Sequence, residues 1–204
     1  MKHVYIEYSS SAYSAMFNRM GYTVVSDPSQ ADFICFTGGS DVSPSLYGDT
    51  KHKTTGSDMY RDLKENRLFD WARRNDKPMV GICRGGQFLN VMSGGRMYQD
   101  VTNHCMSHTI TDLESGEVYY VSSTHHQMMM PSERGRVLAV SDIRSQRDWF
   151  DGEMARRDVS NTGIEVVYYA HTQCLCFQPH PEFTGDTYAG MHKYFKQLLD
   201  DYVY

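Results

Sequence analysis

The chain has 204 residues, of which 40% are hydrophobic and 22% are charged, and its formal net charge is −5 at pH 7. This composition is typical of a soluble globular protein, and the acidic balance excludes the strongly basic surface of a nucleic-acid-binding protein. No stretch approaches the roughly 20 apolar residues of a membrane helix, and the N-terminus lacks the apolar run of a secretory signal. We therefore expect a cytoplasmic protein without a membrane partner. We expect a single domain over residues 1–204.

Strand and helix patterns alternate along the first half of the chain, which is typical of an α/β fold. β-rich runs bounded by turn residues predict strands at 4–8, 22–25, 32–36 and 78–82. Apolar residues at helical spacing predict helices at 10–20, 60–75 and 86–92. Residues 43–58 are rich in Gly, Ser, Thr, Lys and Asp, and we therefore expect a loop there.

The second half is richer in strand patterns. Strands are expected at 117–122, 136–140, 164–170 and 174–178. Residues 142–161 are polar and charged, with no period beyond that of a short helix, and we interpret them as an insertion or lid. An amphipathic helix over 186–202 closes the chain.

The five cysteines do not form a recognisable framework. Their number is odd and their spacing irregular, which favours a reducing compartment over a set of disulfides. Cys174 and Cys176 form a C-x-C pair, but no Cys or His pair lies near them at zinc spacing. We therefore expect no metal and no cofactor, and leave a redox or metal role of the cysteines as a remote alternative.

The sharpest local motif is KPMVGICRGGQFLN, residues 77–90. An apolar strand ends in G-x-C-x-G and a helix follows at once, as in a nucleophile elbow with cysteine in place of serine. Gly81 and Gly85 permit close backbone approach, and the helix N-terminus favours a thiolate at Cys83. The amide of Arg84 is free to face a developing oxyanion. The alternative is that Cys83 is a buried core cysteine beside a simple turn.

The second motif is CFQPHPEF, residues 176–183. Two prolines fix the backbone around His180, and Glu182 follows two residues later. An activated thiol needs a base within hydrogen-bond reach, and that base needs a group to orient it. His180 and Glu182 have the right types for these roles. As alternatives, His180 is a structural or surface histidine and Glu182 a carboxylate at a helix N-terminus.

With these residues in view, the sequence resembles the class I glutamine amidotransferase superfamily. It is most similar to the γ-glutamyl hydrolase branch, peptidase family C26, which includes the γ-glutamyl-γ-aminobutyrate hydrolases. Five motifs carry the resemblance in the same order. They are FTGGSDVSPSLYGD (36–49), YRDLKE (60–65), GICRGGQFLNVMSGGRMYQDV (81–101), SSTHHQ (122–127) and FQPHPEF (177–183).

The resemblance implies a fold and a set of roles. The fold is a flavodoxin-like three-layer α/β sandwich with a mostly parallel central sheet, with the nucleophile at the carboxyl edge. Cys83 is implied as nucleophile, His180 as base and Glu182 as its orienter. The remaining implied residues are the oxyanion-hole amides of Arg84 and of Gly38 or Gly39, and the substrate-binding residues Gln87, Ser123, His125 and Gln127.

Several positions depart from the family pattern. Pro179 stands where the family has Trp, Ser122 where it has Asn, and Thr37 where a proline is common. Residues 142–161 replace a short connection. None of these differences removes a catalytic group, but together they leave the substrate open.

Three functions are therefore considered. The first is a stand-alone, cysteine-dependent hydrolase of the γ-amide bond of glutamine or a γ-glutamyl compound, which proceeds through a glutamyl thioester. The second is a glutaminase subunit that supplies ammonia to a separate synthetase or ligase partner. The third is a non-catalytic binding member of the fold, which has no need of a triad. A homo-oligomer stays open.

Overall fold

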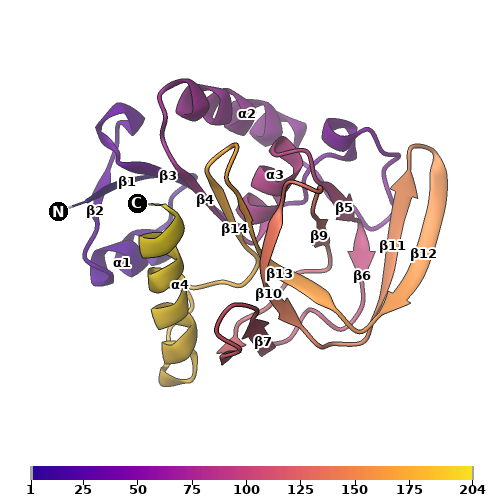
Figure 1. The fold of residues 1–204 in the computed structure, drawn as a ribbon. Helices are drawn as coiled ribbons and strands as arrows, with labels where there is room; N and C mark the ends of the chain where they lie inside the picture. Colours follow the sequence, from indigo (N-terminus) through magenta and orange to yellow (C-terminus); the bar gives the residue numbers. More distant parts are fainter. Residues whose placement is uncertain (1, 204) are drawn as a thin grey trace.

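A nine-stranded mixed sheet forms the centre of the computed structural model, which describes residues 2–203 (Figure 1). The strand order is β2-β1-β3-β4-β14-β13-β10-β7-β8. The first five strands in this order are parallel, and the remaining pairings are antiparallel. The strands are β1 (His3–Glu7), β2 (Thr23–Val25), β3 (Phe33–Phe36), β4 (Met79–Ile82), β7 (His108–Asp112), β8 (Val118–Val121), β10 (Arg136–Ser141), β13 (Gly163–Tyr169) and β14 (Cys174–Phe177).

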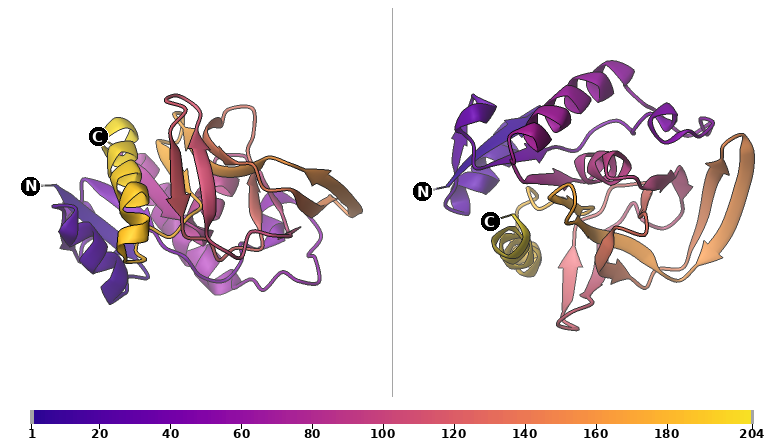
Figure 2. Two further views of the ribbon diagram at one scale, coloured as in Figure 1. Left: turned by 90° about the horizontal axis from the view of Figure 1, so that it is seen from below. Right: turned by 45° about the horizontal axis from the view of Figure 1, so that its top comes forward.

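Helices cover both faces of the parallel part and complete a three-layer sandwich (Figure 2). α1 (Ser11–Arg19) and α4 (Ala189–Tyr202) pack on one face, and α2 (Met59–Arg74) and α3 (Arg84–Met92) on the other. Strand β14 shows why two cores form, because its side chains alternate between the faces. Phe177 joins the cluster under α4, whereas Cys176 joins the cluster under α3. The expected α/β sandwich is confirmed.

The segment 142–161 is a β-hairpin, and the expectation of a short helix there was wrong. β11 (Ser145–Asp151) pairs with β12 (Met154–Ser160) and with the short strand β6 (Asp100–Val101). The hairpin carries charges rather than an apolar stripe, so its period gave no strand signal. Opposite charges face each other across it, as Arg147 pairs with Asp158 at 2.6 Å and Arg157 with Asp148 at 2.7 Å. Its role as an insertion or lid stays a prediction.

Other differences lie at short elements. The two-stranded ladder of β5 (Arg96–Tyr98) and β9 (Met128–Met130) was not expected, nor was strand β7. The loop at 43–58 is confirmed except for a 3-10 turn at Pro44–Tyr47. The last helix is preceded by a 3-10 turn at Asp186–Tyr188. Within residues 2–203, no helix combines the length and the apolar character needed to cross a bilayer.

Candidate active site

Cys83 occupies the tight turn between β4 and α3. Its φ of 51° and ψ of −112° place a non-glycine residue in a strained backbone region that is common at functional sites. The two flanking glycines make the turn possible. A Cβ on Gly81 would lie 2.3 Å from the Gly85 carbonyl carbon, and one on Gly85 would lie 2.1 Å from the Phe36 carbonyl oxygen. The elbow predicted from G-x-C-x-G is therefore present.

His180 follows β14, the neighbour of β4 in the sheet, and reaches the same edge. Its Nδ1 lies 2.7 Å from Glu182 Oε1, and its Nε2 lies 2.9 Å from the Thr124 hydroxyl. Burial lowers the pKa of His180, but hydrogen bonds with Cys83 and Glu182 outweigh this effect and raise the pKa to about 10. The structure thus brings Cys83, His180 and Glu182 together, each 8–9% exposed.

A cavity of about 130 Å³ opens onto this group. Its volume suits a small ligand rather than a drug-sized one. Seven of the predicted residues line it, together with three that the sequence did not assign to the site. The predicted residues are Gly39, Cys83, Arg84, Gln87, His125, Gln127 and His180, and the added residues are Asp41, Thr124 and His126.

Ser123 does not line the cavity. It is buried, and its hydroxyl donates to the backbone carbonyl of His104. Gln87 reaches the cavity, but its side-chain amide also donates to the Gln127 carbonyl at 3.1 Å and to Gln178 Oε1 at 3.2 Å. The Gln178 amide in turn lies 3.6 Å from the Cys83 sulfur. Gln87 therefore both lines the cavity and holds the neighbouring residues Gln127 and Gln178 in position.

The two oxyanion candidates in the first loop differ in availability. The Gly38 amide donates to the Tyr13 hydroxyl at 3.1 Å, which the sequence did not suggest. Gly39 has a φ of 153°, lines the cavity, and its amide has no hydrogen-bond acceptor in the described part of the chain. Arg84 is the first residue of α3, so its amide lacks an intrahelical acceptor. The amides of Gly39 and Arg84 are therefore the pair free to face the cavity.

Buried charges fasten the two oxyanion segments to α2. The Arg84 guanidinium, 1% exposed, forms ion pairs with Asp62 and Glu65, which are both fully buried. Arg61 bonds the same Glu65 at 2.9 Å and donates to the Gly38 carbonyl at 3.0 Å. The predicted RDLKE motif therefore acts through α2, whose side chains hold both the elbow and the glycine loop in place.

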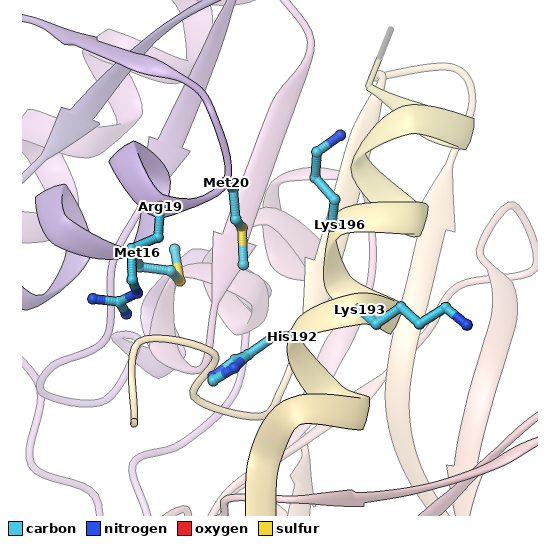
Figure 3. Close-up of a pocket in the computed structure, with 6 residues that line it drawn as sticks. All are labelled: Met16, Arg19, Met20, His192, Lys193 and Lys196. Atoms are coloured by element: carbon cyan, nitrogen blue, oxygen red, sulfur yellow. The ribbon is translucent and has the colours of Figure 1, made fainter. Parts of the chain in front are cut away.

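A second hollow lies between α1 and α4 (Figure 3). Its volume is about 470 Å³, and cationic side chains such as Arg19, Lys193 and Lys196 surround it. Figure 3 shows Arg19 and Lys193 directed away from each other rather than toward a common point. Because it holds neither a nucleophile nor a converging set of polar groups, the smaller cavity at Cys83 is the candidate active site.

The chain is similar to known proteins over most of its length. The model of the family Peptidase C26 matches residues 28–182, a span that includes the elbow and the His180–Glu182 segment. The glutamine amidotransferase-like protein YvdE of Lactococcus lactis subsp. lactis is 29% identical, over 89% of this chain and 84% of its own length. The carbamoyl phosphate synthase small chain of Solidesulfovibrio magneticus is 26% identical over 53% of this chain and 25% of its own.

Among solved structures, a glutamine amidotransferase of Thermotoga maritima superposes with a TM-score of 0.60. The alignment covers 98% of this chain and 84% of that protein, at 13% sequence identity. At this identity the likeness concerns the fold alone.

Proposed function

The chain belongs to the peptidase C26 family, and on that premise we propose that it hydrolyses the γ-amide bond of glutamine or of a γ-glutamyl compound. The observation that carries the proposal is the contact set of His180, which bonds Glu182 on one side and faces Cys83 on the other. This is the arrangement that nucleophilic acyl transfer requires. A non-catalytic role would not explain why a buried cysteine is held in a strained turn beside a histidine.

In the proposed mechanism the Cys83 sulfur attacks the amide carbon, and a tetrahedral intermediate forms. The amides of Gly39 and Arg84 donate to its oxyanion. His180, whose pKa is raised to about 10, carries a proton at neutral pH and gives it to the leaving amine or ammonia. Neutral His180 then takes a proton from water as the water oxygen attacks the thioester carbon. The carbon–sulfur bond breaks, glutamate leaves, and the freed Cys83 sulfur again lies beside protonated His180.

A glutaminase subunit is the second candidate. The observation in its favour is the likeness to a carbamoyl phosphate synthase small chain, whose name describes one chain of a larger enzyme. The same chemistry would then deliver ammonia to a synthetase or ligase partner. Glutamate release that rises on addition of such a partner would favour this function over a self-sufficient hydrolase.

The decisive experiment measures glutamate release by the purified protein alone, with glutamine and with a γ-glutamyl amine, against a Cys83→Ala blank. We expect the native protein to release glutamate and the blank not to. The compound that is hydrolysed faster then limits which amine can be the natural leaving group. Absence of release from both compounds would overturn the self-sufficient hydrolase and leave the partner-dependent subunit.

Glu182→Gln tests the orienting role of the carboxylate. We expect the pKa of His180 to fall by about one unit or more, because the amide carries no negative charge. We expect kcat to fall by about 10²- to 10⁴-fold, less than on loss of the nucleophile. The pKa is measured by NMR titration of the His180 ring, and Glu133→Gln is the matched control because Glu133 is exposed.

The pH dependence of stability follows with a definite sign. The folded pKa of His180 lies above its unfolded value, so its stabilising contribution is complete below pH 6.5 and is lost as pH rises through about 10. The free energy of unfolding, measured with urea, should fall more between pH 6 and pH 10 in the native protein than in Glu182→Gln. Equal losses would contradict the assigned partner.

A further inference from the structure

Behind the wall of the cavity lies a group of buried histidines around one carboxylate, which the proposed mechanism does not use. His104 and Glu165 are fully buried, and His108 and His125 are 8% and 4% exposed. The ring centroids of His104 and His125 are 5.0 Å apart, and those of His104 and His108 are 5.3 Å apart. Three imidazoles and one carboxylate seldom gather in a dry interior without a partner for their polar atoms.

The hydrogen bonds of two rings fix which nitrogen points inward. His125 Nδ1 lies 2.8 Å from the Gln127 carbonyl, and His108 Nδ1 lies 2.9 Å from the Met106 carbonyl. A carbonyl can only accept, so each Nδ1 carries a hydrogen and donates. Nε2 of the neutral His125 ring then presents a lone pair toward Glu165, whereas Nε2 of His108 lies 3.0 Å from Glu165 Oε1 and donates to it. This use of Nδ1 is typical of histidines that bind metal through Nε2.

The atoms that face one another are left without hydrogen-bond partners. His125 Nε2 and Glu165 Oε2 are 3.9 Å apart, and neither has a hydrogen-bond partner in residues 2–203. Both are acceptors, so they cannot satisfy each other. The separation exceeds the spacing of about 3.3 Å between two ligands of tetrahedral zinc by roughly half an ångström. A cation between them would be within bonding distance of both.

His104 supplies a third unpaired group. Neither of its ring nitrogens has a hydrogen-bond partner within the described range, and Nδ1 lies 3.5 Å from Glu165 Oε1. The ligand atoms of His104, His125 and Glu165 all lie within 4.8 Å of one another. Tetrahedral zinc ligands lie about 3.3 Å apart, so binding one ion would draw the three side chains together by up to about 1.5 Å.

We infer that His104, His125 and Glu165 form a binding site for one divalent transition-metal ion of the zinc class. Two imidazoles and one carboxylate favour such an ion over Mg²⁺ or Ca²⁺, which prefer oxygen ligands. The other carboxylate oxygen already has outer contacts, since Ser141 donates to Glu165 Oε1 at 3.0 Å and His108 Nε2 lies 3.0 Å from it. Hydrogen-bonded carboxylates of this kind orient metal ligands.

The ion would join three separate segments, since His104 precedes β7, His125 belongs to the 122–127 segment and Glu165 lies in β13. That segment also supports the candidate base. The Ser122 hydroxyl bonds the backbone of His180, and Thr124 contacts its Nε2. The metal would therefore act as a structural brace behind His180, in a role separate from bond cleavage.

The test uses untagged protein with Cys83→Ala, so that the thiol cannot capture metal with His180. After incubation with Zn²⁺ and dialysis against metal-free buffer, elemental analysis should find about one zinc per chain, and the thermal midpoint should rise. Co²⁺ should give the visible band of a low-coordinate site. X-ray absorption of the zinc form should show imidazole and carboxylate ligands and no sulfur.

Two further variants locate the site in the same background. Glu165→Gln should lose the retained zinc and the rise in midpoint. His126→Asn should keep both, although His126 contacts the carboxylates of Asp41 and Asp100 at 3.2 Å and 3.4 Å. The inference is overturned if Cys83→Ala protein retains less than about a tenth of an equivalent with an unchanged midpoint, if sulfur ligates the zinc, or if His126→Asn abolishes retention. The absorption measurement needs no second substitution, so it stands if Glu165→Gln fails to fold.

Discussion

Replacing Cys83 with alanine should reduce glutamate release by about 10⁴-fold or more, with the protein still folded. In the proposed mechanism the sulfur forms the thioester, and a water molecule in its place lacks both its nucleophilicity and its fixed position. The change removes one atom from the edge of a core cluster, so we expect only a small loss of stability. Activity is measured as initial glutamate release, and folding by circular dichroism and thermal unfolding.

Cys174→Ala is the matched control, because it removes a buried thiol from the amino end of β14, away from the elbow. It should retain the native rate. If Cys83→Ala keeps more than about a hundredth of the native rate, the nucleophile lies elsewhere and the proposed mechanism fails.

Arg84→Met should destabilise the protein by about 3–5 kcal/mol, because it leaves the Asp62 carboxylate buried without its ion-pair partner and Glu65 with Arg61 alone. Methionine fills much of the same volume, so the cost is chiefly electrostatic. Burial lowers the pKa of Arg84 to about 10, in spite of the attraction of Asp62, yet the side chain stays charged at neutral pH. The free energy of unfolding is measured by urea titration at pH 7.

Arg67→Met is the control for the second prediction. Arg67 lies on the exposed side of α2, and the same exchange there should change the free energy of unfolding by less than about 0.5 kcal/mol. Adding Asp62→Asn to Arg84→Met should recover part of the loss, because residue 62 then carries no buried charge, while Glu65 keeps its ion pair with Arg61. Equal stability of Arg84→Met and Arg67→Met would contradict the role of the charge cluster.

The sequence predicted the parts of the site that lie within short motifs. The elbow is local, since Gly81, Cys83 and Gly85 determine the turn through their own backbone geometry. The HPE segment is local too, because two prolines and a two-residue separation allow Glu182 to reach His180. The alternating β and α patterns were sufficient for the sandwich, since the helices show apolar residues at helical spacing and the central strands are continuous buried runs.

The remaining features depend on contacts between distant segments. Thr124 contacts His180 across 56 residues of sequence, and the Tyr13 hydroxyl from α1 accepts the hydrogen bond of the Gly38 amide. Neither pairing leaves a trace in spacing. The buried histidine cluster was also not predicted, because its residues come from three segments that are separate in the sequence. The hairpin at 142–161 was missed because cross-strand ion pairs, rather than an apolar stripe, define its register.

The place of β14 in the sheet has a consequence for biosynthesis. This strand lies between β4 and β13 in the sheet and leaves the ribosome after both of them. Until it arrives, the elbow strand β4 presents an unpaired edge, which is a template for association with other chains. During synthesis Cys83 therefore emerges well before His180, and the two candidate catalytic side chains meet only when β14 inserts beside β4.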